Sequence, residues 1–275
     1  MKFVSEENFS KIGEFIYRKS GIFLEYSKHF DKINNLVQKR SDTLGFDSFR
    51  KYFFHLRFED REGFEFQELM NGVTVNETYF YREKNQFEVL SNHILPELHA
   101  LKAPGEPIRI LSSPCSTGEE PYSIVLHIIE EGNVLEQRDI EIVALDIDST
   151  VIEKAKKGFF SERSVHAVPP HMLREYFTKK SLGYQISEDL LGAIDFKVVN
   201  VFDKPKMRTL GKFDVIFSRN MLIYFDDASR KDVAMTFYDM LKPGGYVMLG
   251  HAEYMSRIVS VFKAKKVGDT LIYQR

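Results

Sequence analysis

The sequence predicts an α/β protein with a separate all-helical domain at its N-terminus. Residues 1–72 show only helical periodicity, whereas short β-branched runs alternate with helical stretches from about residue 105 onward. That alternation is typical of a sheet covered by helices, and 275 residues suffice for both units. We therefore expect an all-α domain at 1–72 and an α/β domain at 73–275, joined by a linker or lid at 73–105.

The composition is ordinary for a globular protein and excludes several classes of function. Hydrophobic residues make up 43% of the chain and charged residues 28%, and no apolar run approaches the roughly 20 residues of a membrane span. The net charge of −2 gives no general reason to expect a nucleic-acid partner. The histidines are scattered without zinc-ligand spacing, so we expect no metal site.

Cysteine usage and the N-terminal residues point to the cytoplasm. Cys115 is the only cysteine, so no internal disulfide can form, which suits a reducing compartment. The first residues, MKFVSEENFS, are mixed and charged, and we expect no secretory signal. We therefore expect a cytoplasmic protein that is not inserted in the membrane.

Residues 1–72 are expected to form four helices. The spacing of Phe9, Ile12 and Ile16 predicts the first helix, which Gly21 should end. A second helix should end at Gly45. A third should open at Asp47 or Ser48, and the fourth is expected at residues 60–71.

The second of these helices carries a basic stripe. Lys28, Lys32, Asn35 and Lys39 fall at i, i+4, i+7 and i+11, so they share one face. The stripe is either a docking face for an acidic partner or a solvated surface, and from the pattern alone the solvated surface is favoured. The helical domain as a whole is neutral, and Asp31 nearby weakens the positive field.

The linker contains an unusual cluster at residues 73–83, VTVNETYFYRE. Polar residues stand beside three aromatic residues and Arg82, and the pattern fits neither a helix nor an alternating strand. The aromatics could anchor an ordinary connector. We favour a lid whose side chains enter a site in the second domain. The pattern of residues 85–101 then predicts a helix.

The stretch IRILSSPCSTGEEPYS at residues 108–123 is the centre of the α/β domain. A buried strand ends in small residues and leads into a helix, so backbone N–H groups and the helix dipole point at whatever lies above the strand end. Ser116 and Glu119 have the spacing of a capping box.

A second strand, residues 142–146, ends on Asp146, a carboxylate suited to ribose hydroxyls. The preceding turn lacks both G-x-G-x-x-G and the lysine of a phosphate-binding loop. A nucleoside-cofactor site and a plain strand–turn–helix packing unit therefore both remain open.

The middle of the domain is expected to depart from the main sheet. After helices at residues 150–157 and 169–177, the stretch 183–200 alternates polar and apolar residues around Gly192. We interpret it as a small antiparallel excursion, an inserted β-subdomain near residues 178–199. Asn200 and Val201 should follow a strand end near the cofactor, although Asn200 serves equally well as a turn residue.

A further buried strand, residues 213–217, leads into Ser218-Arg219-Asn220 and then Tyr224. Polar groups at the carboxyl end of a parallel strand are where open α/β sheets bind ligands. The alternative is that Arg219 pairs with a carboxylate and Tyr224 packs in the core. A helix at 228–241, a strand at 246–250 and two closing edge strands, 261–263 and 270–273, complete the chain.

Five blocks of this sequence resemble the chemotaxis receptor glutamate O-methyltransferases of the CheR type. The blocks occur in the order of the family's motifs, and the resemblance extends over nearly the whole chain. They are NETYFYRE (76–83), CSTGEEPYS (115–123), ALDID (144–148), FSRNMLIYFD (217–226) and LKPGGYVMLGHAE (241–253). Two positions depart from the family: Ala252 stands where Ser is common, and Ser218 where Cys is frequent.

The resemblance implies a class I S-adenosylmethionine-dependent methyltransferase fold, a Rossmann-like mixed sheet whose last strand is antiparallel. It implies that Arg82 and Tyr224 lie beside the methyl group and that Lys28, Lys32 and Lys39 dock the receptor. The β-subdomain corresponds to one that grips a receptor tail in some members. The cofactor site would be lined by Asn76, Thr78, Arg82, Glu119, Asp146, Asn200, Val201, Arg219 and Asn220.

The implied reaction is methylation of receptor glutamates by a cytoplasmic monomer, with S-adenosylhomocysteine as the product. A glutamate with a pKa of about 4.3 is already ionised at neutral pH and needs no general base. We expect Asn76, Thr78 and the backbone at 116–118 to hold the methionine end of the cofactor. We also expect Glu119 to leave its helix cap when cofactor binds. Two alternatives remain: a class I methyltransferase with another acceptor, and a non-catalytic module that binds the cofactor or its product as a signal.

Overall fold

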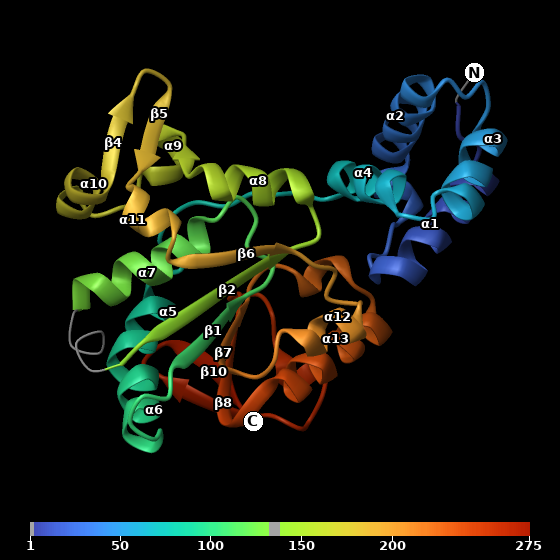
Figure 1. Ribbon diagram of the computed structural model, residues 1–275. Coiled ribbons are helices and arrows are strands. Elements are labelled where there is room, and N and C mark those ends of the chain that lie inside the picture. Colours follow the sequence, from blue (N-terminus) through green and yellow to red (C-terminus); the bar gives the residue numbers. More distant parts are fainter. Residues whose placement is uncertain (1–2, 132–137) are drawn as a thin grey trace.

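The computed structural model describes residues 3–131 and 138–275, so Met1 and Lys2 of the expected N-terminal domain lie outside the described residues. Four α-helices form a separate N-terminal lobe, at the upper right of Figure 1. A π-helical turn, His55–Glu59, follows the third of them. The α-helices are α1 (Glu6–Ser20), α2 (Tyr26–Leu44), α3 (Phe49–Phe54) and α4 (Phe64–Val73).

The helix boundaries follow the expected stop signals, with one exception. Gly21 and Gly45 end α1 and α2 in the left-handed conformation that glycine tolerates best, with φ angles of 71° and 75°. The fourth helix starts at Phe64 rather than near residue 60. The reason is that the Asp60 carboxylate lies ahead of the helix and accepts hydrogen bonds from the N–H groups of Glu65 and Phe66.

The linker leads into a broken helix and then into the large sheet. The helical part consists of α5 (Lys84–Val89), a π-helical turn (Leu90–Ile94) and α6 (Leu95–Leu101). The seven-stranded sheet has the order β6-β2-β1-β7-β8-β10-β9, in which β6, β2, β1, β7 and β8 are parallel. Its strands are β1 (Ile108–Ser112), β2 (Ile140–Asp146), β6 (Ile194–Val198), β7 (Phe213–Ser218), β8 (Leu241–Leu249), β9 (Lys263–Val267) and β10 (Thr270–Gln274).

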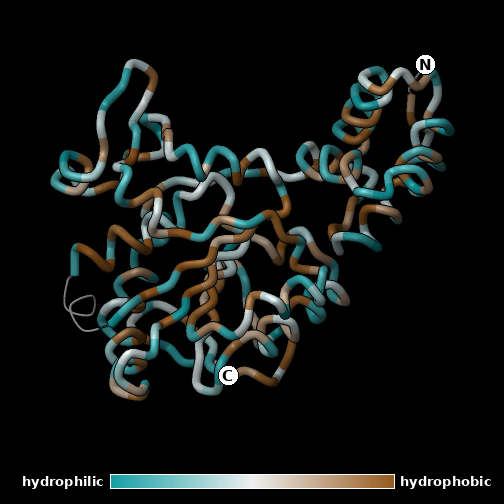
Figure 2. The backbone as a smooth tube through the Cα atoms, viewed as in Figure 1, coloured by the Kyte–Doolittle hydropathy of each residue, from teal (hydrophilic) through white to brown (hydrophobic). Residues whose placement is uncertain are grey.

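Helices cover both faces of the sheet, as the alternation of strands and helices predicts. Successive strand residues point to opposite faces, so Ile110 packs in the core under α7 and Leu111 in the core under α13. In Figure 2 the central strands are accordingly coloured mainly as hydrophobic. The remaining helices are α7 (Glu119–Glu131), α8 (Ser149–Lys157), α9 (Glu162–Val165), α10 (Pro170–Tyr176), α11 (Glu188–Leu191), α12 (Lys204–Thr209) and α13 (Asp227–Met240). Two 3-10 turns are Leu222–Tyr224 and Met255–Arg257.

The expectation of an antiparallel excursion over residues 183–200 is right in part. A small antiparallel sheet exists, but it consists of β3 (Phe159–Phe160), β5 (Gly183–Ile186) and β4 (Phe177–Lys180). The stretch Ile194–Val198 does not belong to it: it is β6, which pairs parallel with β2 at the edge of the large sheet. β6 alternates because Ile194 and Phe196 face the hydrophobic core, whereas Asp195 and Lys197 lie on the opposite, more exposed face. That alternation resembles the pattern of a hairpin strand.

The end of the chain also differs in one respect from the expected pair of edge strands. β10 runs antiparallel to β8, as the resemblance implies, but it lies between β8 and β9, so β9 alone forms the edge. Three lysines on β9, Lys263, Lys265 and Lys266, are exposed. Charged side chains on an edge strand oppose pairing with another chain.

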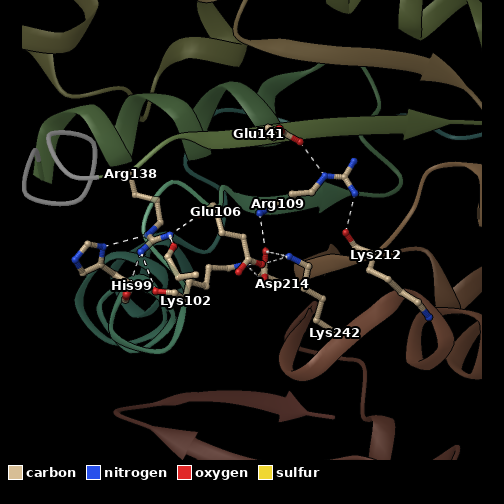
Figure 3. A network of polar contacts seen from close by, with 10 residues as sticks. His99, Lys102, Glu106, Arg109, Arg138, Glu141, Lys212, Asp214 and Lys242 are labelled. Carbon is tan, nitrogen blue, oxygen red and sulfur yellow. Dashed lines mark hydrogen bonds and ion pairs between the residues drawn. The ribbon is translucent and has the colours of Figure 1, made fainter.

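A polar network ties the strand starts together, at the end of the sheet opposite the strand ends that carry the predicted site (Figure 3). The buried Asp214 carboxylate accepts a hydrogen bond from the Arg109 backbone N–H at 2.8 Å. It also forms an ion pair with Lys102 Nζ at 2.9 Å. Lys102 and Lys242 both reach Glu106, and these hydrogen bonds lower the pKa of Glu106 to about 2. The network holds the loop before β1 against β7 and β8.

Within residues 3–131 and 138–275, no helix combines the length and apolar character needed to cross a membrane. The same residues contain no group of three or more His, Cys, Asp or Glu side chains arranged to hold a metal ion.

Candidate functional site

The carboxyl ends of the parallel strands and the linker enclose a cavity of about 310 Å³. This volume is at the lower end of the roughly 300–1,000 Å³ typical of small-molecule sites. Its walls come from the linker, the loops after β1, β2, β6 and β7, and the segment between α1 and α2. All but one of the predicted cofactor and catalytic residues line it: Asn76, Thr78, Arg82, Asp146, Asn200, Val201, Arg219, Asn220 and Tyr224.

Asp146 lies at the end of β2 and fixes the loop after β1. Its two carboxylate oxygens accept backbone hydrogen bonds, from the Ser116 N–H and from the Asp148 N–H, each at 2.9 Å. The side chain is 4% exposed, and burial raises the pKa of Asp146 to about 6, against the opposing effect of these hydrogen bonds. A carboxylate so placed can accept further hydrogen bonds from a ligand's hydroxyl groups.

Glu119 is the predicted residue that does not line the cavity, and the capping-box expectation is wrong. Its carboxylate accepts hydrogen bonds from Thr117 Oγ1 at 2.6 Å and Ser164 Oγ at 2.7 Å. Ser116 adopts φ 48° rather than the extended backbone of an N-cap residue, so its side chain does not cap α7. The prediction that Glu119 leaves a cap on cofactor binding therefore has no basis.

Its neighbour Glu120 lines the cavity instead. Glu120 accepts a hydrogen bond from Ser112 Oγ at 2.7 Å and forms a buried ion pair with Arg219, with Nε and Oε2 2.5 Å apart. Arg219 also donates to the Arg82 carbonyl oxygen at 2.6 Å and lies over the Phe87 ring. Arg219 thus pairs with a carboxylate and also lines the cavity, so the two predicted alternatives do not exclude each other.

The linker is fastened to the second domain by Asp148. One oxygen of this buried carboxylate accepts hydrogen bonds from Thr74 Oγ1 and Asn76 Nδ2, both at 2.8 Å. The other oxygen caps α8 by accepting from the Thr150 and Val151 N–H groups. The Asn76 amide nitrogen also donates to Thr74 Oγ1 at 3.2 Å, so both of its hydrogens are used and the amide oxygen remains to accept a hydrogen bond from a ligand.

Arg82 is held in a strained turn of the linker. The flanking residues Tyr81 and Glu83 both have φ 57°, a conformation that bulky residues rarely adopt. Phe80 and Tyr81 are buried in the core, and the Tyr81 N–H donates to Ser123 Oγ on α7 at 2.9 Å. The linker cluster therefore combines features of an anchored connector and of a lid: two aromatic residues anchor it, and its polar residues line the cavity.

The loop after β7 carries Asn220 and Tyr224, and Glu253 positions it. The Glu253 carboxylate, 7% exposed, accepts hydrogen bonds from the N–H groups of Asn220 and Leu222 at 2.8 Å and of Gly250 at 3.0 Å. Asn220 has φ 58°, so this arrangement stabilises an unusual backbone conformation. Burial, the largest effect, raises the pKa of Glu253, and the three N–H donors oppose that rise.

Tyr224 keeps its proton as a potential donor. Desolvation raises the pKa of Tyr224, and the Arg82 charge opposes this without reversing it. Among the residues that the structure describes, the hydroxyl has one long hydrogen bond, 3.5 Å, to the Val75 carbonyl oxygen. A neutral hydroxyl with so weak a partner is available to a ligand.

The helical domain is attached directly to this loop. The Phe23 N–H donates to the Tyr224 carbonyl oxygen at 2.9 Å, and Tyr17 Oη donates to Asp226 Oδ2 at 2.9 Å. Asn200 Nδ2 donates to the Lys19 carbonyl oxygen at 2.7 Å. Asn200 thus closes a turn through Phe202, as one of its two interpretations predicts, and it also lines the cavity.

The three lysines of the predicted stripe on α2 are all exposed, but their partners differ. Lys28 forms an ion pair with Glu25. Lys32 Nζ donates to the carbonyl oxygens of Val73 and Thr74, at 2.6 and 3.1 Å, and lines the cavity. Burial lowers the pKa of Lys32. Lys32 therefore fastens α2 to the linker, a role that helical spacing does not reveal.

Sequence reasoning missed three carboxylates of this site, Glu120, Asp148 and Glu253. Each lies within one of the five motif blocks, and each binds groups that are distant in sequence. The signal that could have found them is an acidic residue in a motif that follows a buried strand, since a buried charge requires several partners.

Comparisons with known proteins agree with this geometry. Residues 76–270 match the family described as CheR methyltransferase, SAM binding domain. Chemotaxis protein methyltransferase 2 of Vibrio cholerae is 45% identical over 273 residues, 99% of this chain and 94% of that protein. The chemotaxis protein methyltransferases of Salmonella typhimurium and Escherichia coli are each 32% identical, over 95% and 93% of this chain and 88% and 87% of theirs.

We predict that Glu253→Gln weakens both the fold and ligand binding. The amide places an N–H₂ donor against backbone N–H donors, so at least one buried hydrogen bond is lost, worth about 1–3 kcal/mol. Denaturant unfolding should show that loss, and calorimetry should show weaker binding of S-adenosylhomocysteine. Glu188→Gln, at an exposed position on α11, is the matched control. Unchanged stability and affinity in Glu253→Gln would contradict a positioning role.

Proposed function

The chain belongs to the CheR family of chemotaxis protein methyltransferases, and we propose that it transfers the methyl group of S-adenosylmethionine to glutamate side chains of chemoreceptors. The observation that carries this proposal is the placement of Arg82 and Tyr224 in one cavity with Asp146, from three separate segments. Chemoreceptor methylation by this family supports a cytoplasmic location.

The cavity residues fit the proposed cofactor. Asp146 offers carboxylate oxygens for ribose hydroxyls, and Glu120 adds a second carboxylate to the lining. Ser116 lines the cavity, and its buried Oγ has no hydrogen-bond partner within the described residues. An unsatisfied polar atom at a cavity wall is what a ligand's polar group would complete. We assign Asp146 to the ribose, and Asn76, Thr78 and the loop at 116–118 to the methionine end. Arg82, Asn200, Val201, Arg219 and Asn220 would complete the wall.

S-adenosylmethionine supplies an activated methyl group on a cationic sulfur, so the protein's contribution to catalysis is mainly positioning. The acceptor carboxylate, with a pKa of about 4.3, is ionised at neutral pH and needs no general base. Arg82 and Tyr224 would orient that carboxylate through hydrogen bonds. Arg82 already donates to the Glu77 carbonyl oxygen at 3.0 Å, so only part of its hydrogen-bonding capacity would go to the acceptor carboxylate. Partial engagement favours transfer, because tight binding of the ground-state anion would slow it.

The proposal is tested by incubating the protein with radiolabelled S-adenosylmethionine and a chemoreceptor cytoplasmic fragment. Label that is released by mild base, as expected of a glutamyl methyl ester, supports the proposal. Base-stable label would indicate another acceptor group. Cofactor binding without any transfer would indicate a non-catalytic signalling module.

In the same assay, Tyr224→Phe should retain cofactor affinity and lose turnover by about tenfold to a hundredfold. The lost hydroxyl removes one of two groups that orient the acceptor, and misplacement of a reacting group carries a cost of this order. Tyr254→Phe, at an exposed tyrosine outside the cavity lining, is the control. A wild-type rate in Tyr224→Phe would show that the Tyr224 hydroxyl has no role in the reaction.

Binding of S-adenosylhomocysteine should weaken as the pH falls below about 6. Ribose hydroxyls donate to the ionised Asp146, so binding lowers a pKa that burial has raised to about 6 in the free protein. Affinity should therefore fall by up to about tenfold per pH unit below that value. Asp146→Asn should bind weakly with a flat pH profile over this range. A pH-independent wild-type affinity between pH 5 and 7 would refute the ribose role.

We also propose that Lys28 and Lys39 guide the acidic receptor to the site, whereas Lys32 acts within the fold. Replacing Lys28 and Lys39 by Glu should raise the apparent KM for the receptor several-fold, less so at high salt, and leave cofactor affinity unchanged. Lys263→Glu with Lys266→Glu, on the edge strand β9, makes the same charge change elsewhere. An equal rise in KM in that control would show that net charge, and not the position of Lys28 and Lys39, determines the affinity for the receptor.

A further inference from the structure

The residue that follows Arg82 in the chain carries a carboxylate to which the proposed function gives no role. Glu83 has φ 57°, a left-handed conformation that is unfavourable for this residue type, and its side chain is only 14% exposed. A strained backbone conformation persists only where the surrounding structure determines it. The contacts of the Glu83 side chain therefore bear on how Arg82 is held.

Both oxygens of the Glu83 carboxylate have partners on the far side of the linker. Oε1 accepts a hydrogen bond from the His251 backbone N–H at 3.4 Å and lies 2.9 Å from Nδ1 of the same residue. Oε2 accepts from Gln86 Nε2 at 2.7 Å, and that nitrogen also donates to the Leu249 carbonyl oxygen at 2.7 Å. Glu83 thus joins the linker to the end of β8 and to the turn that follows it.

This turn, residues 250–253, also holds the loop that carries Tyr224. It is closed by a hydrogen bond from the Glu253 N–H to the Gly250 carbonyl oxygen at 2.9 Å. The Glu253 carboxylate accepts from the Asn220 N–H at 2.8 Å. A Cβ atom on Gly250 would lie 2.9 Å from Glu253 Oε2 and 3.1 Å from Asn220 Nδ2, so the turn packs closely against the loop after β7.

Other contacts fix the Arg82 backbone on its remaining sides. The Arg82 carbonyl oxygen accepts from Arg219 Nη1 at 2.6 Å, and the Tyr81 N–H donates to Ser123 Oγ at 2.9 Å. The Arg82 guanidinium group donates to the Glu77 carbonyl oxygen at 3.0 Å, within the same linker. The anchoring of the linker backbone therefore determines where the guanidinium group lies.

We propose that Glu83 is a positioning residue for methyl transfer, which fixes Arg82 relative to Tyr224 by binding the turn at 250–253. This inference rests on the proposed function. Glu83 is not part of the cavity lining, so it acts through Arg82 and not on the ligands directly. Because the proposed reaction needs no general base, its rate depends on how Arg82 and Tyr224 align the acceptor carboxylate. These two residues belong to separate segments, and the turn at 250–253 binds both segments.

The test is Glu83→Gln, assayed with a chemoreceptor fragment that the wild type methylates. The amide keeps the shape of the side chain but places an N–H₂ group against the donors of either His251 or Gln86, so at least one contact is lost. We expect kcat to fall about tenfold, because orientation acts in the transition state, while the affinity for S-adenosylhomocysteine stays within about twofold. His251→Ala removes one donor at a side chain that is 76% exposed, and should lower kcat by only about twofold to threefold.

Glu59→Gln is the matched control. It breaks another glutamate–histidine pair, in which Glu59 Oε2 lies 3.0 Å from His55 Nδ1, in the N-terminal domain and outside the cavity lining. This variant should keep the kcat of the wild type. A fall in kcat equal to that of Glu83→Gln would show that the loss of such a pair acts on the fold in general.

A double-mutant cycle with Arg82→Ala separates positioning of Arg82 from any other effect. Once Arg82 is truncated, Glu83→Gln should lower the residual rate by no more than about twofold, because the group that it positions is gone. A wild-type kcat in Glu83→Gln, a loss of cofactor affinity as large as the loss of kcat, or an equal further loss in the Arg82→Ala background would each overturn the proposal. Failure of the proposed function is distinct, since the wild type would then form no base-labile ester.

Discussion

Two buried carboxylates at the end of β2, Asp146 and Asp148, hold the cavity together. Asp146 binds the loop after β1 through the Ser116 N–H, and Asp148 binds the linker through Thr74 and Asn76. Burying such groups is unfavourable unless several hydrogen-bond donors compensate, so each carboxylate orders the chain segments around it. Asp146 has fewer donors than Asp148, and burial raises its pKa to about 6. Asp146 can therefore still accept hydrogen bonds, and it lines the cavity.

The sequence predicted most elements and most of the cavity wall, because both depend on local pattern and on strand ends. Apolar runs identified the parallel strands, glycines identified the ends of α1 and α2, and polar residues after each strand proved to share one edge of the sheet. β6 was misplaced because an edge strand of a parallel sheet alternates in the same way as a hairpin strand. Periodicity records exposure and does not record which strand is the neighbour.

The remaining errors concern side chains whose partners are distant in sequence. Glu119 and Glu120 are adjacent on α7, and only the tertiary structure decides that the first binds Ser164 and the second binds Arg219. Lys32 belongs to a helical stripe by spacing, but the linker carbonyl groups of Val73 and Thr74 lie within reach of its ammonium group. Helical spacing specifies a face of a helix and says nothing about what packs against that face.

The attachment of the helical domain has a consequence for how substrate binding and chemistry are linked. The contacts that join that domain to the site loops include Phe23 to Tyr224, Tyr17 to Asp226, and Lys19 to Asn200. If the receptor docks on α2, as we propose, it binds a domain whose backbone is hydrogen-bonded to the proposed acceptor-orienting residue. Docking distant from the cavity would then act on Tyr224 through these hydrogen bonds. Because the proposed reaction needs orientation more than proton transfer, an attachment of this kind would favour the rate.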